Sequence, residues 1–285
     1  ASISLSASGE KFTDIDNWIV GTDSDVYLDA AVGSAATGST SATLTGLPAS
    51  QAVEILAYVN KGSASIKTKT LEQRAITVSI DSDGLGQAFL PLYKADIFDV
   101  QEVLKGGDSN ISYLNRFTLD DGQRDNHYDL GRLLLKGGQS APAGSVFISY
   151  RHFDHGVSGD FFAVNSYTGQ VEYDQIPQYR FSNGQRVRLY NYLDFRSVMD
   201  SAGEFSNSGL GARVIELPKP TSLVTADITY YQARAGKLVI DRDGIIRFNV
   251  GAAGFTPQTP TKPDGTLGLY DIRLNANTLN DSDVT

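Results

Sequence analysis

The sequence predicts an all-β protein, with antiparallel, β-sandwich-like packing in two β regions and little helix. Three observations lead to this fold class: apolar and polar residues alternate over short runs, turn dipeptides separate the runs, and the 285 residues include 28 glycines. Alternation places successive side chains on opposite faces of a strand, so each run predicts a half-buried antiparallel strand. Many short strands of this kind bury their apolar faces by packing as sheets.

Each element follows from its own run. Residues 53–59 and 76–80 alternate in the N-terminal half, and residues 186–189 and 246–249 alternate in the C-terminal half. Residues 99–105 are the exception, because their pattern predicts a short helical turn. The sequence therefore predicts strands joined by turns and loops, with this one segment as a short helical turn.

Turn chemistry marks two hairpins. Asn183-Gly184 lies between Phe181 and Val187, and Asp243-Gly244 lies between Val239 and Ile246. Asn-Gly and Asp-Gly tolerate the positive φ angles of tight hairpin turns. We divide the chain into an N-terminal β-sandwich-like region, 1–110, and a second β region, 111–285, in which the proline-rich stretch 257–263 forms a loop or short linker.

Composition excludes several classes of function. The net charge of −9 disfavours nucleic acid and anionic membrane surfaces as partners. The absence of cysteine excludes disulfides and thiolate metal sites. No apolar run is long enough for a membrane span, and the first residues do not form a signal peptide. Because Met199 is the only methionine, we expect a piece of a longer protein.

One stretch is distinctive, Asn115-Arg116-Phe117-Thr118-Leu119-Asp120-Asp121-Gly122-Gln123-Arg124-Asp125-Asn126-His127-Tyr128-Asp129-Leu130-Gly131-Arg132. It resembles the signature of a family of large tail and baseplate structural proteins of tailed bacteriophages, including cyanophages. Further similar segments are Phe153-Asp154-His155, Phe162 to Tyr167, Tyr173 to Pro177, Leu193-Asp194-Phe195-Arg196 and Leu269 to Leu274. The resemblance runs from Leu47 to the C-terminus and is strongest from Asn115 to Arg196.

The resemblance implies a non-enzymatic structural component of a phage tail, in the baseplate, a fibre or the neck. It implies a virion protein that assembles in the host cytoplasm and binds other virion proteins, with no catalytic residues and no cofactor. We expect a homo-oligomer within a symmetric assembly. The alternatives are a carbohydrate-binding module that recognises a host surface glycan, and a glycan-cleaving tailspike-type enzyme.

The residues of the signature point to a structural loop. Gly122 suits a tight turn, and Arg124 is expected to fork onto Asp125, Asp129 or backbone carbonyls. Asn126 is expected to satisfy loop amides. The predicted structural loop comprises Gly122, Gln123, Arg124, Asp125, Asn126, Tyr128 and Asp129.

A second candidate surface lies on the predicted hairpin near residue 184. Arginine alternates with tyrosine there, and both residue types are enriched at protein interfaces. The candidate interface residues are Arg186, Arg188, Tyr190 and Tyr192.

Catalytic and metal sites have weaker signals. His152 and His155 converge on a metal only if a turn separates them, because strand positions three apart face opposite sides. The segments at 81–84 and 241–244 begin like calcium loops but carry leucine or isoleucine at the third ligand position, so Asp-initiated turns explain them better. Acidic residues such as Glu172 and Asp174 offer carboxylate pairs for glycoside hydrolysis, but any acidic protein does so.

Overall fold

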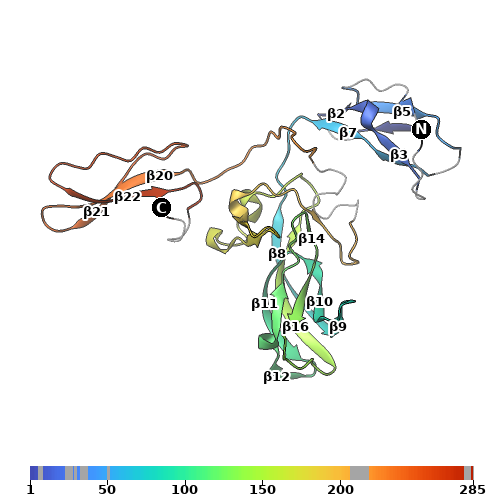
Figure 1. Ribbon diagram of the computed structural model, residues 1–285, viewed down its shortest axis with the longest axis horizontal. Coiled ribbons are helices and arrows are strands. Elements are labelled where there is room, and N and C mark those ends of the chain that lie inside the picture. The colour runs from blue at the N-terminus through green and yellow to red at the C-terminus, as the bar shows by residue number, and fades with distance from the viewer. Residues whose placement is uncertain are drawn as a thin grey trace. The chain divides into compact units, whose positions relative to one another are not determined.

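The computed structural model describes residues 1–5, 9–22, 28, 31–32, 38–49, 52–205, 218–278 and 284. The protein is all-β, with several antiparallel sheets and no helix of seven residues or more among the described residues, which confirms the predicted fold class. None of its described helices has the length and apolar character needed to cross a membrane. The chain forms two compact units, and Figure 1 shows their elements.

The first unit contains Ala1–Ser65 and a returning segment, Pro218–Ala226. Its elements are β1 (Ser2–Ser4), β2 (Glu10–Thr13), η1 (Ile15–Asn17), β3 (Ile19–Gly21), β4 (Ala31–Val32), β5 (Ser41–Thr45), β6 (Glu54–Leu56) and β7 (Tyr58–Lys61). They form one three-stranded sheet, β1-β5-β4, and the pairs β2-β7 and β3-β6. The run predicted as one strand, 53–59, is thus two strands with different partners, β6 and β7.

A small core holds the first unit together. The side chains of Phe12, Val20 and Leu44 are buried. The ring of Trp18 packs edge-on against Phe12 at 4.8 Å, and its indole N–H donates to the Thr13 carbonyl at 3.0 Å. An aromatic pair of this geometry adds stability beyond its buried area.

Polar contacts hold the returning segment against the N-terminal part of the first unit. The Ala64 amide donates to the Thr225 carbonyl at 2.9 Å, and the Lys219 ammonium contacts the Asp14 carboxylate at 2.6 Å. The first unit is therefore built from chain segments more than 150 residues apart.

The second unit contains Ile66–Leu217 and Asp227–Thr285 and is built around a β-sandwich. One sheet has the order β12-β11-β16-β8 and the other β13-β15-β10-β9. These elements are β8 (Lys69–Ser79), β9 (Asp81–Ser82), β10 (Ala88–Ala95), β11 (Ile97–Lys105), β12 (Asp108–Ser112), η2 (Leu114–Arg116), β13 (Phe117–Asp120), β15 (Leu130–Leu135) and β16 (Ser145–His155). The long strands β8 and β16 pair over eleven residues without a register shift.

The two sheets enclose the largest core cluster of the described residues. Val103, Ile148 and Tyr150 from one sheet meet Leu90 and Leu133 from the other, all at most 2% exposed. The Tyr150 hydroxyl donates to the Leu92 carbonyl across the sandwich, so its polar end is satisfied inside the core.

The sandwich crosses the domain boundary predicted from the sequence. β11 ends at Lys105 and pairs with β16, and β10 pairs with β15, so both sheets join chain from either side of residue 110. The division of the chain lies instead near residue 65. The sequence-based boundary differed because strand patterns do not reveal which distant strands pair.

The predicted helical turn at 99–105 was wrong. These residues belong to strand β11, which is paired on both edges, with β12 and β16. Val103 is fully buried in the sandwich core. Hydrogen bonding and burial on the sheet override the weak local pattern.

Short elements follow the sandwich. They are β14 (His127–Tyr128), η3 (Val164–Tyr167), η4 (Tyr173–Gln175), β17 (Gln178–Arg180), β18 (Arg186–Arg188), η5 (Leu189–Asn191) and β19 (Ser197–Val198). β17 and β18 pair antiparallel around Asn183-Gly184, with Gly184 at φ 88°, which confirms the first predicted hairpin. A second core cluster, which includes Phe153, Tyr167 and Leu189, lies beneath these elements.

The C-terminal sheet has the order β21-β20-β22. Its strands are β20 (Arg234–Ile240), β21 (Ile246–Val250) and β22 (Leu267–Leu274). β20 and β21 pair around Asp243-Gly244, with Gly244 at φ 77°, which confirms the second predicted hairpin.

The two faces of this C-terminal sheet differ. Val239 and Ala235 are buried on one face, where Lys237 also pairs with Asp271. The opposite face carries mostly apolar side chains on its paired strand positions, with Arg234 at one end, opposite Leu274. The apolar side chains are Leu238 and Ile240 of β20, Ile246, Phe248 and Val250 of β21, and Leu267, Tyr270 and Ile272 of β22. We call this set the apolar face.

Candidate functional site

The predicted structural loop begins with a turn that only glycine fits. Gly122 adopts φ 84°, and a Cβ atom at this position would lie 2.1 Å from the Asp129 carbonyl oxygen. The Gly122 carbonyl accepts the Asp129 amide at 2.6 Å, so the two ends of the loop are directly bonded. The sequence LDDG thus turns sharply after β13 because no side chain blocks the contact.

Arg124 ties the loop to the sandwich. Its guanidinium donates to both oxygens of Asp120, at 2.8 and 2.9 Å, and to Asp129 at 2.9 Å. Arg132 donates to Asp120 at 3.1 Å from the neighbouring strand β15. The sequence suggested Asp129 as a partner of Arg124, and the structure adds Asp120, whose pKa is lowered because the hydrogen bonds and charge of Arg124 outweigh its burial.

Asp125 docks the loop onto the predicted interface hairpin. Its carboxylate accepts hydrogen bonds from the Tyr179 hydroxyl at 2.6 Å and from the Ser182 amide at 3.0 Å. The Ser182 hydroxyl also donates to it, and this bond, with those from the Tyr179 hydroxyl and the Ser182 amide, lowers the pKa of Asp125. Asn126 contacts the His127 ring at 2.8 Å rather than loop amides. The loop therefore joins the sandwich to the segment that follows it.

Beneath the loop lies a buried charge network of six residues: Lys69, Asp96, Tyr128, His155, Asp194 and Arg196. Sequence reasoning placed only Tyr128 among the site residues. The Lys69 ammonium lies 2.6 Å from Asp96 Oδ2 and donates to the Tyr128 hydroxyl oxygen at 3.1 Å. His155 Nε2 lies 2.7 Å from the same Asp96 oxygen. Each of these four side chains is at most 3% exposed.

Backbone pairing brings Lys69 and His155 together. Lys69 begins β8, His155 ends β16, and the two are directly opposite in the register, so their side chains share one face. Asp96 is the single residue between β10 and β11, at φ 52°, where the chain crosses from one sheet of the sandwich to the other. The Asp96 carbonyl accepts the Phe153 amide at 3.0 Å, which fixes this crossing against β16.

Arg196 forms the second half of the network. It donates to Asp194 through Nε at 2.9 Å and Nη2 at 2.7 Å, and Nη2 also reaches the Tyr128 hydroxyl at 2.8 Å. Nη2 and Nη1 reach Gln123 Oε1 at 3.1 Å and the Arg124 carbonyl at 3.0 Å. The Tyr128 hydroxyl in turn donates to Asp194 at 2.5 Å. The structural loop is thus bonded from below through Arg196.

Aromatic rings enclose the ammonium group of Lys69. Its Nζ lies 4.6 Å from the ring centres of Tyr128 and Phe162, 4.9 Å from Tyr167 and 5.6 Å from Phe153. The ring faces attract the cation, but they also exclude water from it. Three buried polar atoms of the described residues nearby accept or donate no hydrogen bond: Asp96 Oδ1, His155 Nδ1 and the Tyr167 hydroxyl.

Burial and charged partners perturb the titrating groups of the network. The pKa of Asp96 is lowered, because the charge of Lys69 and the hydrogen bond and charge of His155 outweigh burial. Burial lowers the pKa of Lys69 and of His155, and it raises the pKa of Tyr128 and Tyr167. The pKa of Asp194 is lowered, because the hydrogen bonds and charge of Arg196 outweigh burial. The network thus holds a primary amine against a carboxyl group in a site that water does not enter.

The candidate interface residues are not all on the surface. Arg186 is exposed on β18, and Tyr192 is 37% exposed. Tyr190 is only 3% exposed, because the chain leaves the strand for η5 and the alternation stops. Arg188 is half-buried and lies 5.8 Å from the Tyr190 ring. The structure therefore removes Tyr190 from any surface formed by the folded chain.

The weaker sequence signals resolve into local structure. β16 continues through His152 and His155 without a turn, so the two rings face opposite sides. No three metal-ligating side chains come together in the described part of the chain. Asp83 and Asp241 accept amides of their own turns, at 2.8 to 3.0 Å. The acidic pair considered for glycoside hydrolysis lies at η4, where Glu172 precedes the helix and Asp174 is in its first turn.

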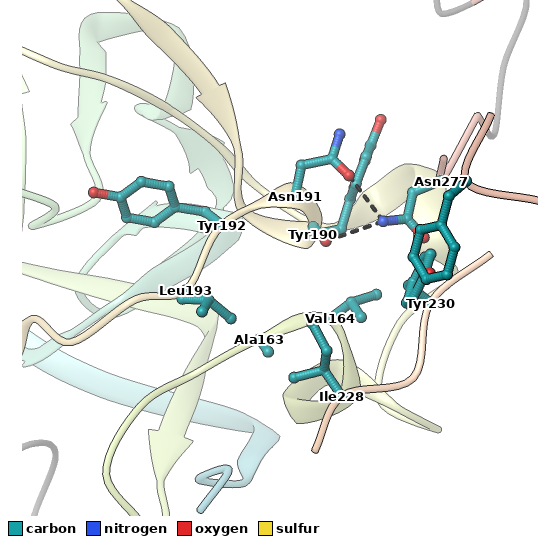
Figure 2. A pocket seen from close by; sticks show the side chains of 10 residues that line it. Ala163, Val164, Tyr190, Asn191, Tyr192, Leu193, Ile228, Tyr230 and Asn277 are labelled. Atoms are coloured by element: carbon teal, nitrogen blue, oxygen red, sulfur yellow. Dashed lines mark hydrogen bonds between the residues drawn. The ribbon is translucent and has the colours of Figure 1, made fainter. Parts of the chain in front are cut away.

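A separate cavity of about 360 Å³ lies between η5 and the segment leading into the C-terminal sheet. Asn277 donates to the Tyr190 carbonyl and to Asn191 at its rim, and Figure 2 shows these two bonds. Its lining residues are Ala163, Val164, Tyr190, Asn191, Tyr192, Leu193, Ile228, Tyr230, Phe255 and Asn277. The rings of Tyr230 and Phe255 and the amides of Asn191 and Asn277 line it, so the cavity offers rings and polar groups to a ligand.

Comparisons with protein-family models, with curated proteins and with solved structures find no match to this chain.

Proposed function

We propose that this chain is a non-enzymatic architectural component of a phage tail, which assembles by binding further copies of itself and other virion proteins. The resemblance of residues 115–132 to tail proteins supports the virion role. The observation that carries the assembly role is the apolar face of the C-terminal sheet. We assign this face to a second copy of the chain.

The apolar face is large, and Arg234 lies at one end of it. Five of its side chains are between 40% and 70% exposed: Phe248, Val250, Ile246, Leu267 and Tyr270. At roughly 100 Å² of exposed surface each, two such faces would bury about 1,000 Å², the lower limit of a specific interface. An apolar face matches a second copy of itself, because a two-fold axis places like surface against like surface.

The packing of the face is already ordered. The Phe248 ring lies over Gly236, where an added Cβ atom would approach the ring to 2.3 Å. A ring that is already seated on the sheet loses little side-chain entropy when a partner covers it. Exposed apolar patches of this extent are typical of interaction sites.

The strand edges extend this surface. β21 and β22 are the outer strands of the sheet, and among the described residues β22 gains only a single bridge, Leu274 to Val284. Unpaired edge groups bind other strands by main-chain hydrogen bonds. The apolar face and the strand edges together favour an oligomer over a monomer.

Adjacent residues on β21 supply a matched test. Phe248→Gln removes a ring from the apolar face, and Arg247→Gln places the same side chain on the opposite face. Sedimentation velocity of the wild type should show a concentration-dependent oligomer, which Phe248→Gln weakens at least tenfold in Kd while Arg247→Gln leaves it unchanged. A wild type that remains monomeric at high micromolar concentration would refute the assignment.

The virion role has its own test. Immunogold labelling of intact particles with an antibody to this chain should decorate the tail. The virion role would be contradicted if the infected-cell lysate contains the protein but purified particles show no label.

A carbohydrate-binding module is the second candidate, favoured by the cavity beside η5. Tyr230 and Phe255 present rings, and Asn191 and Asn277 present amides, which is the combination that stacks and hydrogen-bonds a sugar. A glycan array should then give binding that Tyr230→Ala abolishes. Absence of binding to any host glycan fraction would leave the assembly role alone.

A further inference from the structure

We propose that Lys69 and Asp96 become joined by an isopeptide bond between Lys69 Nζ and Asp96 Cγ. The bond would covalently link the start of β8 to the point where the chain crosses between the two sheets of the sandwich. This inference goes beyond the assembly role and does not depend on it.

The geometry places the two reacting groups in contact. Lys69 Nζ and Asp96 Oδ2 are 2.6 Å apart, and the side chains are 0% and 1% exposed. Both ends are held by backbone structure, Lys69 by its pairing with His155 and Asp96 by the one-residue crossing. Fixing an amine against an acyl carbon replaces a bimolecular encounter with an intramolecular one.

Burial in the aromatic enclosure acts toward the neutral forms that react. An amine is nucleophilic only without its proton, and a carboxyl group is electrophilic only with one. Moving a proton from the ammonium to the carboxylate converts a buried ion pair into a neutral pair, which a dry aromatic enclosure stabilises relative to separated charges. Burial lowers the pKa of Lys69, in the direction that this transfer needs, whereas the charge of Lys69 and the hydrogen bond and charge of His155 lower the pKa of Asp96, in the opposite direction.

The step balances without an external reagent. Lys69 Nζ attacks Asp96 Cγ, the new C–N bond forms, and one C–O bond breaks. Of the three ammonium protons, one stays on the amide nitrogen and two leave with the departing oxygen as water. No electron is gained or lost.

The network supplies partners for the protons in transit. The Tyr128 hydroxyl accepts from Nζ at 3.1 Å and donates to Asp194 at 2.5 Å. A proton that the amine passes along this relay returns to the departing Asp96 oxygen, so that water leaves and Asp194 ends as a carboxylate. His155 Nε2 lies 2.7 Å from Asp96 Oδ2, the oxygen that would remain as the amide carbonyl. Both groups touch the reacting atoms or their protons.

The product relieves two costs of the present arrangement. Asp96 Oδ1 is buried without a hydrogen bond, and departure of this oxygen as water removes the unsatisfied atom. The buried ammonium and carboxylate charges disappear together, so neither needs solvation inside the protein. The remaining carbonyl oxygen still faces His155.

An exposed pair of the same residue types serves as an internal control. Lys94 Nζ lies 3.2 Å from Asp154 Oδ1, but about a third of each side chain is exposed. Both side chains remain in contact with solvent there, so we expect no bond between Lys94 and Asp154.

Mass spectrometry of the purified wild-type protein decides the question. Under denaturing conditions the intact mass should fall below the sequence mass by one water molecule. Trypsin should then release a branched peptide of residues 68–74 and 95–105, uncut after Lys69 and lighter by the same amount. An intact mass equal to the sequence mass in folded, aged protein would overturn the proposal.

Two variants locate the bond. Lys69→Met and Asp96→Ala should each return to their full sequence mass, while a Lys94→Met control keeps the loss of water. A loss of water that persists in either Lys69→Met or Asp96→Ala would place the dehydration elsewhere and refute the assignment. The wild-type measurement remains decisive even if a variant fails to fold.

Discussion

Replacing Arg196 with methionine should destabilise the second unit strongly. The guanidinium makes two bonds to Asp194, one to Tyr128 and two to the structural loop, and it stacks on the rings of Tyr128 and Tyr179 at 4.2 and 4.7 Å. Methionine fills part of the volume but leaves the Asp194 carboxylate, 3% exposed, without its counter-charge.

The size of the effect follows from burial. Removing one partner of a buried ion pair costs about 3–5 kcal/mol of unfolding free energy, because the other charge stays buried. The exposed pair of Lys94 and Asp154 offers the contrast, since such pairs contribute at most about 1 kcal/mol. Lys94→Met introduces the same side chain and is the matched control.

The single tryptophan makes the assay selective. Trp18 lies in the first unit, so its fluorescence during urea unfolding reports that unit, whereas near-ultraviolet circular dichroism of the many tyrosines reports mainly the second unit. Arg196→Met should shift the tyrosine transition to lower urea and leave the Trp18 transition in place. A loss below about 1 kcal/mol would refute the reasoning that this charge is indispensable to the network.

Three further changes have defined outcomes. Gly122→Ala should cost at least about 2 kcal/mol by urea unfolding, because a Cβ atom meets the Asp129 carbonyl and φ is left-handed; an unchanged midpoint would contradict the steric argument. Leu90→Ala should cost about 2–5 kcal/mol in the same measurement, and Leu85→Ala, at a site 96% exposed, almost nothing. Burial lowers the pKa of His152 in the folded protein. Below about pH 6.5 the unfolded chain therefore binds a proton at this histidine that the folded chain does not bind. The free energy of unfolding falls as the pH drops through that range. His152→Gln should therefore reduce the stability difference between about pH 7.5 and about pH 5.5, and an identical difference in both proteins would argue against this site.

Local chemistry made part of this fold predictable. The hairpins at Asn183-Gly184 and Asp243-Gly244 were found from the sequence because a turn depends on its own residues. The segment 99–105 was not, because its apolar spacing fits a helix or a strand and only pairing with β16 decides between them. The completion of the first unit by residues 218–226 left no local signal at all.

The charge network was hidden for a related reason. Lys69 lies in the run Lys67-Thr68-Lys69-Thr70, which has the composition of a solvated strand. Its partner Asp96 is distant in sequence, and His155 is still more distant. The one available signal was Asp194-Phe195-Arg196, where opposite charges two residues apart share one side of an extended chain within an aromatic segment.

The returning segment also affects how the chain transmits force. The polypeptide passes between the two units three times, after residues 65, 217 and 226, and the bond from Ala64 to Thr225 holds the first and last of these crossings together. Tension applied between the units is thereby divided among several covalent paths rather than carried by one linker. Pulling the first and last crossings apart would have to break the hydrogen bond between Ala64 and Thr225.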